Sequence, residues 1–465
     1  MIDLGEIENV YLVGIGGIGM SALARYFLKK GFRVGGYDRS ATMLTAELIK
    51  EGCDVHYKED IRLVDEVFCD PLRTLIIYTP AVPAGHKELA YFRQKGHQVK
   101  KRSEVLGLIT RDTKTTAIAG SHGKTTVSSM IAHILCQSGT RCNAFIGGIM
   151  KNYGSNVILS PENDVTVVEA DEFDHSFLRL TPSVAVVTSC DPDHLDIYKD
   201  YSSLIAAFNQ FAEQVKTGGH LILNEKVTGM IKSPGNVKTY TYSLNGKTDF
   251  HAENRGKSGK SHFFDLVFPG CRISHLTLGI LPGTVNIENA VAASAAAWVL
   301  GIDPVNIGRE LASYQGVRRR FDIRVKTPGG VYIDDYAHHP EEIKGFIRSV
   351  REIFPGKKIT GIFQPHLYTR TRDFADGFAD SLGGLDELIL LDIYPAREEP
   401  VPGVTSSLIF DKVMLKRKQL CSMNDLLTVL SKHHYEVVVT MGAGDIDRMV
   451  EPLERFLAER ATVNE

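Results

Sequence analysis

Apolar runs of strand length alternate with segments of helical periodicity from the beginning of the chain. In the first region the apolar runs cover residues 10–13, 32–37 and 74–79, and apolar positions recur at helical spacing over residues 21–30. A polar stretch, Arg111–Thr115, ends this region. The pattern predicts a first α/β domain over residues 1–112.

Two further regions repeat this alternation. The second has apolar runs at residues 116–119, 165–168 and 184–187, a Thr- and Tyr-rich stretch at 238–280 that predicts hairpins, and an Ala-rich helix at 290–300. The third has runs at 331–333, 359–363, 387–391 and 437–440, and a helix is predicted over 340–353. Such alternation favours mostly parallel sheets, so we expect an α/β protein with further domains at 113–318 and 319–465.

The composition is that of an ordinary globular protein: 465 residues, of which 43% are hydrophobic and 23% charged. A formal net charge of −3 supplies no general attraction for nucleic acid or anionic lipid, so we expect neither partner. No apolar run approaches the roughly 20 residues of a membrane helix, and the first residues lack a secretory pattern, which favours a cytoplasmic protein. The seven cysteines include no CxxC pair, so we expect reduced thiols in a monomer or homodimer.

The first glycine turn, Gly14–Gly19, fits the GxGxxG pattern between a strand and a helix. Its glycines let a pyrophosphate approach the backbone N–H groups at a helix N-terminus. Asp38 ends the next predicted strand, where folds of this kind hold a ribose hydroxyl. The motif predicts a nucleotide or dinucleotide ligand, and taken alone it favours an NAD-dependent oxidoreductase.

A second glycine turn, Gly120–Thr126 (GSHGKTT), follows an apolar strand and opens a helix. It is a shortened form of the P-loop pattern, which has a glycine where Ile118 stands. The amides of the turn and the Lys124 ammonium can wrap the β- and γ-phosphates of ATP, and the Thr125 hydroxyl can bind Mg²⁺.

A P-loop needs an acid on a neighbouring strand to share the magnesium ion. The apolar run at 165–168 leads into Glu169, Ala170, Asp171 and Glu172, and Glu169 is our first choice. A solvated acidic turn is the alternative. His194 also follows a predicted strand, but Mg²⁺ prefers oxygen ligands, so its chemistry alone favours a structural histidine.

Two polar loops in the third region each follow a predicted strand: Asp334–Pro340 (DDYAHHP) and Gln364–Asp373 (QPHLYTRTRD). Their histidines and aspartates suggest zinc, but adjacent histidines point in different directions, unlike two ligands spaced i, i+4 on one helix face. Since loops at the carboxyl ends of parallel strands bind ligands, we predict contacts with a substrate or nucleotide there.

The motifs GIGGIGMS, GSHGKTT, EADE, DHLD, NIEN, RRRFD, DDYAHHP and QPHLYTRTRD occur in the order and spacing of the Mur ligase family. The chain resembles this family over nearly its whole length. The resemblance implies a Rossmann-like N-terminal domain for a UDP-sugar, a central P-loop ATPase-like domain with a mostly parallel sheet, and a C-terminal Rossmann-like domain. It also implies an ATP-dependent ligase that converts the lactyl carboxylate of UDP-N-acetylmuramate into an acyl phosphate and joins it to L-alanine, in peptidoglycan precursor synthesis. A preformed murein tripeptide is the alternative amine.

The resemblance assigns residues to each ligand. Those implied for the UDP-sugar are Gly16, Gly17, Ser21, Asp38 and Thr79. Those implied for ATP are Gly120, Ser121, His122, Gly123, Lys124, Thr125, Thr126, Asn286, Asn289, Arg320 and Asp335. Thr125 and Glu169 would hold one Mg²⁺ and His194 a second. Those implied for the amino acid are Tyr336, His338 and Arg370, with His338 as a proton acceptor or amine positioner. Catalysis would use Lys124, Glu169, His194, His338 and Arg370.

Three positions depart from the family pattern. Val285 stands where a histidine usually precedes the first asparagine, and Leu367 stands where an arginine is frequent. We expect Arg372 to supply the missing cation near the amino acid. Some members carry a carbamylated lysine after the DHLD motif, but the matching stretch here is Ala206–Asn209, so we do not predict that modification.

Overall fold

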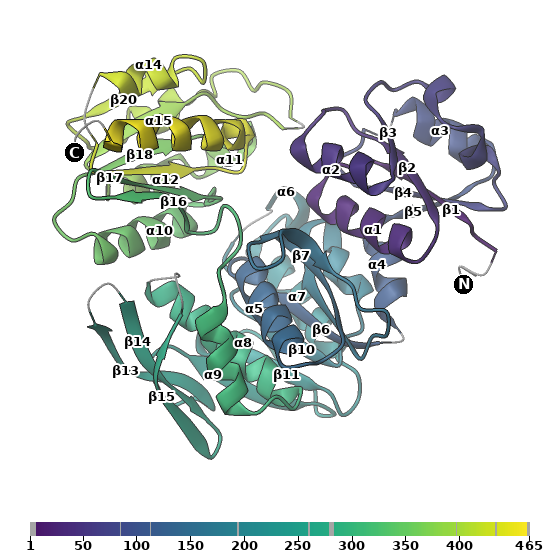
Figure 1. The fold of residues 1–465 in the computed structure, drawn as a ribbon, viewed down its shortest axis with the longest axis horizontal. Helices are drawn as coiled ribbons and strands as arrows, with labels where there is room; N and C mark the ends of the chain where they lie inside the picture. The colour runs from purple at the N-terminus through teal and green to yellow at the C-terminus, as the bar shows by residue number, and fades with distance from the viewer. Residues whose placement is uncertain are drawn as a thin grey trace. The chain divides into compact units, whose positions relative to one another are not determined.

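The computed structural model describes residues 6–83, 85–111, 113–192, 195–258, 261–278, 283–396, 398–432 and 435–462, except for the side chains at 195–196, 257–258, 261–262 and 461–462. Within these ranges the strands form three sheets, and helices alternate with the strands along the chain (Figure 1), which confirms the α/β fold class. The chain divides into two compact units, one comprising most residues up to Gln315 and the other comprising residues 316–465 with two short earlier segments.

The first sheet is wholly parallel, in the order β3-β2-β1-β4-β5. Its strands are β1 (Asn9–Val13), β2 (Arg33–Tyr37), β3 (Asp54–His56), β4 (Thr74–Tyr78) and β5 (Gln98–Lys101). Its helices are α1 (Ile18–Lys29), α2 (Met43–Glu51), α3 (Lys87–Gln94) and α4 (Arg102–Arg111). The strand order reverses between β1 and β4, and such a switch point opens a crevice at the carboxyl ends of the strands.

The second sheet has the order β15-β14-β13-β12-β11-β10-β6-β9-β7-β8 among the described residues. A switch point lies at β6, which has β10 on one side and β9 on the other. The strands near it are β6 (Lys114–Ala119), β7 (Cys142–Met150), β8 (Ser155–Ile158), β9 (Val165–Ala170), β10 (Val184–Val187) and β11 (His220–Asn224). Its helices are α5 (Lys124–Gln137), α6 (Leu195–Tyr198), α7 (Tyr201–Glu213), α8 (Thr284–Val299) and α9 (Pro304–Ser313). Because β6 lies between β9 and β10, the loops after these three strands meet at one edge.

The region predicted to form hairpins contains β12 (Lys238–Ser243), β13 (Phe250–Ser258), β14 (Ser261–Phe268) and β15 (Cys271–Thr277). Only part of that prediction holds. Strands β14 and β15 are antiparallel neighbours, but β12 and β13 pair in parallel through Tyr242 and Phe250. The residues between β12 and β13 thus connect parallel strands instead of turning a hairpin.

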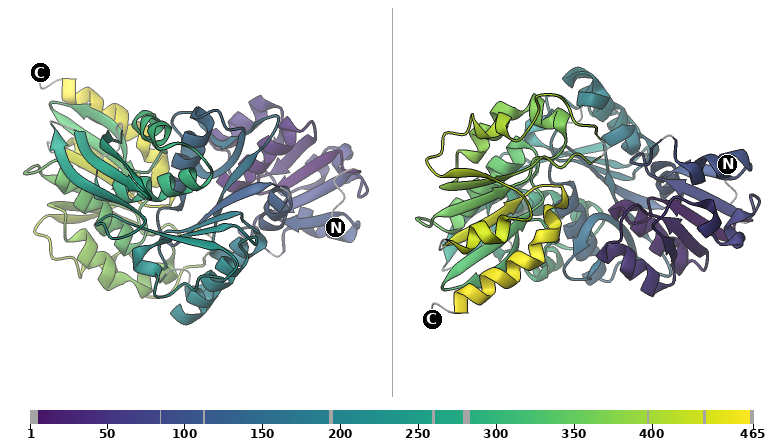
Figure 2. Two further views of the ribbon diagram at one scale, coloured as in Figure 1. Left: turned by 90° about the horizontal axis from the view of Figure 1, so that it is seen from below. Right: turned by 90° about the horizontal axis from the view of Figure 1, so that it is seen from above.

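The third sheet has the order β16-β17-β21-β18-β19-β20, with an antiparallel β16 at its edge. Its strands are β16 (Asp322–Thr327), β17 (Gly330–Asp335), β18 (Ile359–Phe363), β19 (Glu387–Leu391), β20 (Lys418–Cys421) and β21 (Val437–Met441). Its helices are α10 (Pro340–Ile353), α11 (Tyr368–Asp373), α12 (Ala375–Leu382), α13 (Ser407–Phe410), α14 (Leu426–Ser431) and α15 (Val450–Thr462). Helix α15, yellow in Figure 2, packs Leu453 against the core on one face of this sheet.

Helix α1 joins the first sheet to the second within the first compact unit. The fully buried side chain of Asn156, on β8, donates from Nδ2 to the Ile18 carbonyl and to Ser21 Oγ at 2.5 and 3.1 Å. Its Oδ1 accepts from Arg25, 2.7 Å away, and Arg25 also binds Glu51. These contacts fix the first turn of α1, and with it the preceding glycine turn, against the second sheet.

All seven cysteines are free, as expected for reduced thiols. Across the described ranges, every helix is too short or too polar to cross a lipid bilayer.

Candidate active site

The first glycine turn lies at the switch point of the first sheet, between β1 and α1. Gly14 has a φ of +88°, and a Cβ there would lie 2.7 Å from Thr79 Cγ2. The Gly16 N–H donates to Asp38 Oδ2 at 2.8 Å, so a side chain at position 16 would collide with that carboxylate. The structure therefore gathers the predicted residues Gly16, Gly17, Asp38 and Thr79, and gives Asp38 the task of bracing the turn.

Ser21, also predicted to contact UDP, is turned toward the second sheet. Its side chain is fully buried, and its hydroxyl donates to the Ile18 carbonyl at 2.9 Å and accepts from Asn156. This hydroxyl thus both donates and accepts a hydrogen bond inside the protein.

The second glycine turn connects β6 to α5 at the switch point of the second sheet. Gly120 has a φ of +138°, and a Cβ there would collide with Thr188 Oγ1. Gly123 has a φ of +85°, and its Cβ would lie 2.9 Å from Oδ1 of Asn289 on α8. Glycine is needed at both positions, and Asn289 lies beside the turn that is predicted to hold ATP.

The loop after β10 braces this turn from one side. The Thr188 hydroxyl donates to the His122 carbonyl, and the His122 N–H donates to Ser189 Oγ at 2.9 Å. Ser121 Oγ donates to the Asp191 carbonyl at 2.7 Å. The side chains of Ser121 and His122 thus face the bracing loop, while the following Thr125 and Thr126 are buried in the first turns of α5.

The end of β9 supplies carboxylates on the other side of the turn. Glu169 accepts from Thr125 Oγ1 at 3.2 Å, from Ser128 Oγ at 3.3 Å and from the Gly147 N–H at 2.5 Å. The hydroxyl and carboxylate predicted to share Mg²⁺ are therefore neighbours. Oxygen donors of this kind suit a hard divalent cation.

Glu172 was not singled out from the acidic run, yet it is the carboxylate that pairs with the P-loop lysine. Lys124 Nζ donates to the Glu172 carboxylate at 2.8 Å and to the Gly120 carbonyl at 2.6 Å. Glu172 is only 1% exposed. Burial acts to lower the pKa of Lys124, but Glu172, Asp171 and Glu169 outweigh it and raise this pKa above its usual value. The lysine is therefore held charged at the mouth of the turn.

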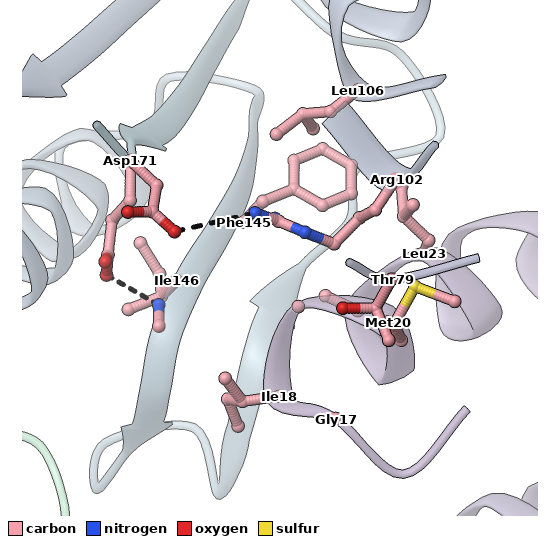
Figure 3. Close-up of a pocket in the computed structure, with 14 residues that line it drawn as sticks. Gly17, Ile18, Met20, Leu23, Thr79, Arg102, Leu106, Phe145, Ile146 and Asp171 are labelled. Atoms are coloured by element: carbon pink, nitrogen blue, oxygen red, sulfur yellow. Dashed lines mark hydrogen bonds and ion pairs between the residues drawn. The ribbon is translucent and has the colours of Figure 1, made fainter. Parts of the chain in front are cut away.

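A cavity of about 250 Å³ connects the first glycine turn with the end of β9. Gly17, Met20 and Thr79 lie on one side, and Asp171 lies on the other (Figure 3). Arg102, at the start of α4, reaches across toward Asp171, with 3.8 Å between the charged groups. A ligand in this cavity would contact both the glycine turn and the acidic end of β9.

In the second unit, Asp335 ends β17 and binds backbone. Its carboxylate accepts from the N–H groups of Phe321 and Ala337 at 2.6 and 2.8 Å. Burial raises the pKa of Asp335 to about 6, although Arg320 opposes the shift. Asp335 thereby holds the arginine-rich segment before β16 next to the DDYAHHP loop.

Tyr336 is the centre of the cluster formed by that loop. The guanidinium carbons of Arg319 and Arg320 lie 5.3 and 5.0 Å from its ring centroid. The His338 ring lies edge-on at 5.3 Å, and its Nδ1 is 3.2 Å from a Glu342 carboxylate oxygen. Three of the residues predicted from the resemblance, Arg320, Tyr336 and His338, are therefore in contact.

The loop after β18 contributes arginines with different surroundings. Arg370 is buried and lies close enough to act on the pKa of Tyr336, which burial raises. Arg372 is exposed and pairs with the adjacent Asp373 at 2.7 Å. Leu367 is buried at a φ of +72° at the start of α11. The positive charge of Arg370 thus acts on Tyr336, and among the described residues the structure supplies no contact between Arg372 and the Tyr336 cluster.

The two remaining predicted residues are His194 and Asn286. His194 lies outside the described residues, so its role stays a prediction. Asn286 lies one turn before Asn289 on α8. Sequence reasoning overlooked Arg102, Glu172 and the bracing loop after β10, because their partners come from distant parts of the chain.

Models of known protein families match most of the chain. Three family models match in succession: "Mur ligase family, catalytic domain" over residues 9–114, "Mur ligase middle domain" over 118–297, and "Mur ligase, glutamate ligase domain" over 319–444. The chain belongs to the Mur ligase family. Members of this family are ATP-dependent amide-forming ligases, and the P-loop with its acidic partner suits that chemistry.

Individual Mur ligases resemble the chain over almost its full length. A UDP-N-acetylmuramate–L-alanine ligase from Parabacteroides distasonis is 53% identical over 99% of both chains. The crystal structure of a UDP-N-acetylmuramate–alanine ligase from Thermotoga maritima has a TM-score of 0.81 and 27% identity, covering 98% of this chain and all of that one. A murein peptide ligase from Psychrobacter arcticus has a TM-score of 0.72 at 20% identity over 97% and 99% of the chains, a likeness of fold alone.

Proposed function

We propose that this Mur ligase joins L-alanine to the lactyl carboxylate of UDP-N-acetylmuramate and hydrolyses ATP to ADP and phosphate in doing so. The observation that carries the proposal is the cavity that runs from the first glycine turn to Glu169. A sugar nucleotide anchored at that turn would extend its acyl end toward the P-loop, where a γ-phosphate would lie. The relative at 53% identity, which is named for this reaction, supports the choice of substrates.

The first chemical step is phosphoryl transfer to a carboxylate. A carboxylate is a poor electrophile, so an amine cannot displace its oxygen in water at a useful rate. In-line attack of the lactyl carboxylate on the γ-phosphate gives an acyl phosphate and ADP. Lys124, already charged and fixed beside the turn, stabilises the negative charge on the transferring group, since enzymes accelerate this reaction mainly by positioning and electrostatics.

Magnesium fits the donors at the mouth of the P-loop. Thr125 Oγ1 and the Glu169 carboxylate, 3.2 Å apart, would hold it together with phosphate oxygens. When bound, the ion would neutralise phosphate charge during transfer. We assign a second ion to His194 only by family resemblance.

The second step is attack of the neutral amine of L-alanine on the acyl phosphate, with release of phosphate. We assign the amino-acid side to Tyr336, His338 and Arg370. The contact between His338 and Glu342 would orient the imidazole to accept a proton from the amine. Because the reaction consumes ATP and a nucleotide-activated sugar, we place it in the cytoplasm.

Isotope tracing tests this function directly. With ¹⁸O in the lactyl carboxylate, one labelled oxygen should appear in the released phosphate, because the acyl phosphate bond cleaves on the carbonyl side. ADP release should require UDP-N-acetylmuramate. Unlabelled phosphate would contradict the acyl phosphate mechanism.

A competition between amines tests the choice of substrate. L-alanine should support product formation at concentrations where a murein tripeptide does not. Preferential use of the tripeptide would instead favour the alternative ligase, and nicotinamide reduction without ADP release would favour an oxidoreductase.

A further inference from the structure

The cavity beside the first glycine turn contains a cation that no motif predicted. Arg102 is the first residue of α4, and its side chain is 22% exposed. A Cβ built on Gly19 would lie 2.8 Å from Arg102 Nη1 and 3.1 Å from its Cδ. Gly19 is the second residue of α1, so its missing side chain leaves room for the guanidinium beside the N-terminus of this helix.

The first glycine turn and the start of α1 lack a positively charged side chain that could bind an anion. Backbone N–H groups at a helix N-terminus attract phosphate, but Gly14–Met20 contains no Lys or Arg. Among the described residues that line the cavity, Arg102 is the sole cation, and Glu169 and Asp171 are acidic. A diphosphate placed there needs a positive partner, and Arg102 is the available one.

The guanidinium also has unused hydrogen-bonding capacity. The carboxylate of Asp171 is 3.8 Å away, which exceeds hydrogen-bond length. Arg102 donates no hydrogen bond to any other residue that the structure describes. Arginine has five N–H donors and binds phosphate oxygens in pairs. The preceding residue behaves differently, because Lys101 Nζ forms a close ion pair with Asp174 at 2.7 Å. Lys101 therefore anchors the start of α4 to the segment after β9, and that task does not require Arg102.

We propose that Arg102 binds the diphosphate of the UDP-sugar and supplies the positive charge that the first glycine turn lacks. The inference rests on the proposed substrate but not on the ligase reaction. In this arrangement the turn contributes backbone N–H groups, α4 contributes the cation, and Asp171 keeps the guanidinium over α1 in the absence of ligand. Arg102 is thus a substrate-binding residue that the glycine motif alone does not reveal.

Calorimetry with the full-length chain and a graded set of ligands tests this role. The ligands are uridine, UDP, UDP-N-acetylglucosamine and UDP-N-acetylmuramate, all without ATP. Arg102→Ala should weaken the three diphosphates by about 10- to 100-fold, the range for a charged hydrogen bond, and leave uridine unchanged. Arg102→Lys should give an intermediate loss, because lysine keeps the charge without the paired donors.

Two variants separate binding from a structural role. Lys50→Ala removes an exposed cation of the same domain that does not line the cavity, and it should leave all four affinities unchanged. Asp171→Asn breaks the long ion pair but retains Arg102, so its affinity for UDP should equal or exceed that of the original protein.

Three results would overturn the proposal. An equal loss for uridine and UDP in Arg102→Ala would indicate a structural role, as would matching losses in Arg102→Ala and Asp171→Asn. A loss confined to UDP-N-acetylmuramate would assign Arg102 to the lactyl carboxylate. A protein that binds UDP through Arg102 but forms no amide would contradict the proposed function and leave this inference intact.

Discussion

The two glycine turns have the same local design but obtain their charge in different ways. Each follows a parallel strand at a switch point and opens a helix. The P-loop carries its own cation, Lys124, and a buried acid, Glu172, holds this cation in place. The turn of the first domain carries none, and the acid beside it, Asp38, binds the Gly16 N–H instead.

The difference corresponds to what each turn is proposed to do. A cation that stabilises a transferring phosphoryl group must be positioned before the reaction. Lys124 is therefore part of the loop itself and is paired with Glu172 when ATP is absent. A turn that only anchors a diphosphate needs net attraction, which a residue on another element can supply. If this comparison is correct, substitutions near the two turns should have separable effects.

The largest effect is expected from Lys124→Ala. Loss of this charge should reduce amide formation by at least about 100- to 1,000-fold, as loss of one preorganised donor does elsewhere. ADP release measures the rate, and UDP binding by calorimetry is the internal control, which should be unchanged. Equal loss of UDP binding would mean that the two turns are not independent.

Glu172→Gln should destabilise the nucleotide-free protein by about 3 kcal/mol, since it removes one partner of a largely buried ion pair. ATP should recover part of that loss, because its phosphates replace the carboxylate as partners of Lys124. Thermal unfolding with and without ATP measures both quantities. Glu225→Gln, at an exposed acid, is the control, and an equal change in the two variants would contradict the pairing.

Glu169→Gln should shift the magnesium dependence of the reaction. We expect the Mg²⁺ concentration for half-maximal rate to rise by about 10- to 100-fold, the range for lost metal-site contacts. Thr125→Val should act in the same direction, whereas Thr125→Ser keeps the hydroxyl and serves as the control. An unchanged Mg²⁺ response in Glu169→Gln would remove this residue from the metal site.

Gly16→Ala should give the smallest effect, confined to the first turn. The new Cβ would lie 2.8 Å from Asp38 Oδ2 and 2.7 Å from Thr45 Cγ2. Overpacking of this kind costs about 1–3 kcal/mol, and we expect about a tenfold loss of UDP affinity with ATP binding retained. Gly85→Ala, where a Cβ meets nothing within 4 Å, should bind UDP normally. Unchanged UDP affinity in Gly16→Ala would show that the turn tolerates the clash.

Sequence patterns predicted the elements that carry strong local signals. The helix predicted over 340–353 is α10 at the same bounds, because His339 caps its first turn and Pro340 suits the first helical position. Strands β10, β18 and β19 also match, since buried parallel strands appear as continuous apolar runs. Short or mixed strands such as β3 and β5 have no such signal and were not predicted.

The site was predictable where it lies within motifs and not where it depends on packing. Thr125 and Glu169 were predicted to be neighbours, and they lie 3.2 Å apart, because the adjacent parallel strands β6 and β9 bring their carboxyl ends together. Glu172 and Asp171 are separated from Glu169 by only a few residues, and composition does not show which of the three faces Lys124. Arg102 acts across two sheets, and no pattern within α4 indicates that partner.

The amide of Asn156 has a consequence for protein engineering. Arg25 is 9% exposed and hydrogen-bonds to Asn156 on β8 as well as to Glu51 within its own domain. A chimaera that receives the sugar-binding module from this enzyme, without an equivalent of Asn156 in the recipient, would enclose a guanidinium with one acceptor missing. The sugar-binding domain can therefore be transferred to another protein only together with strand β8, which carries Asn156.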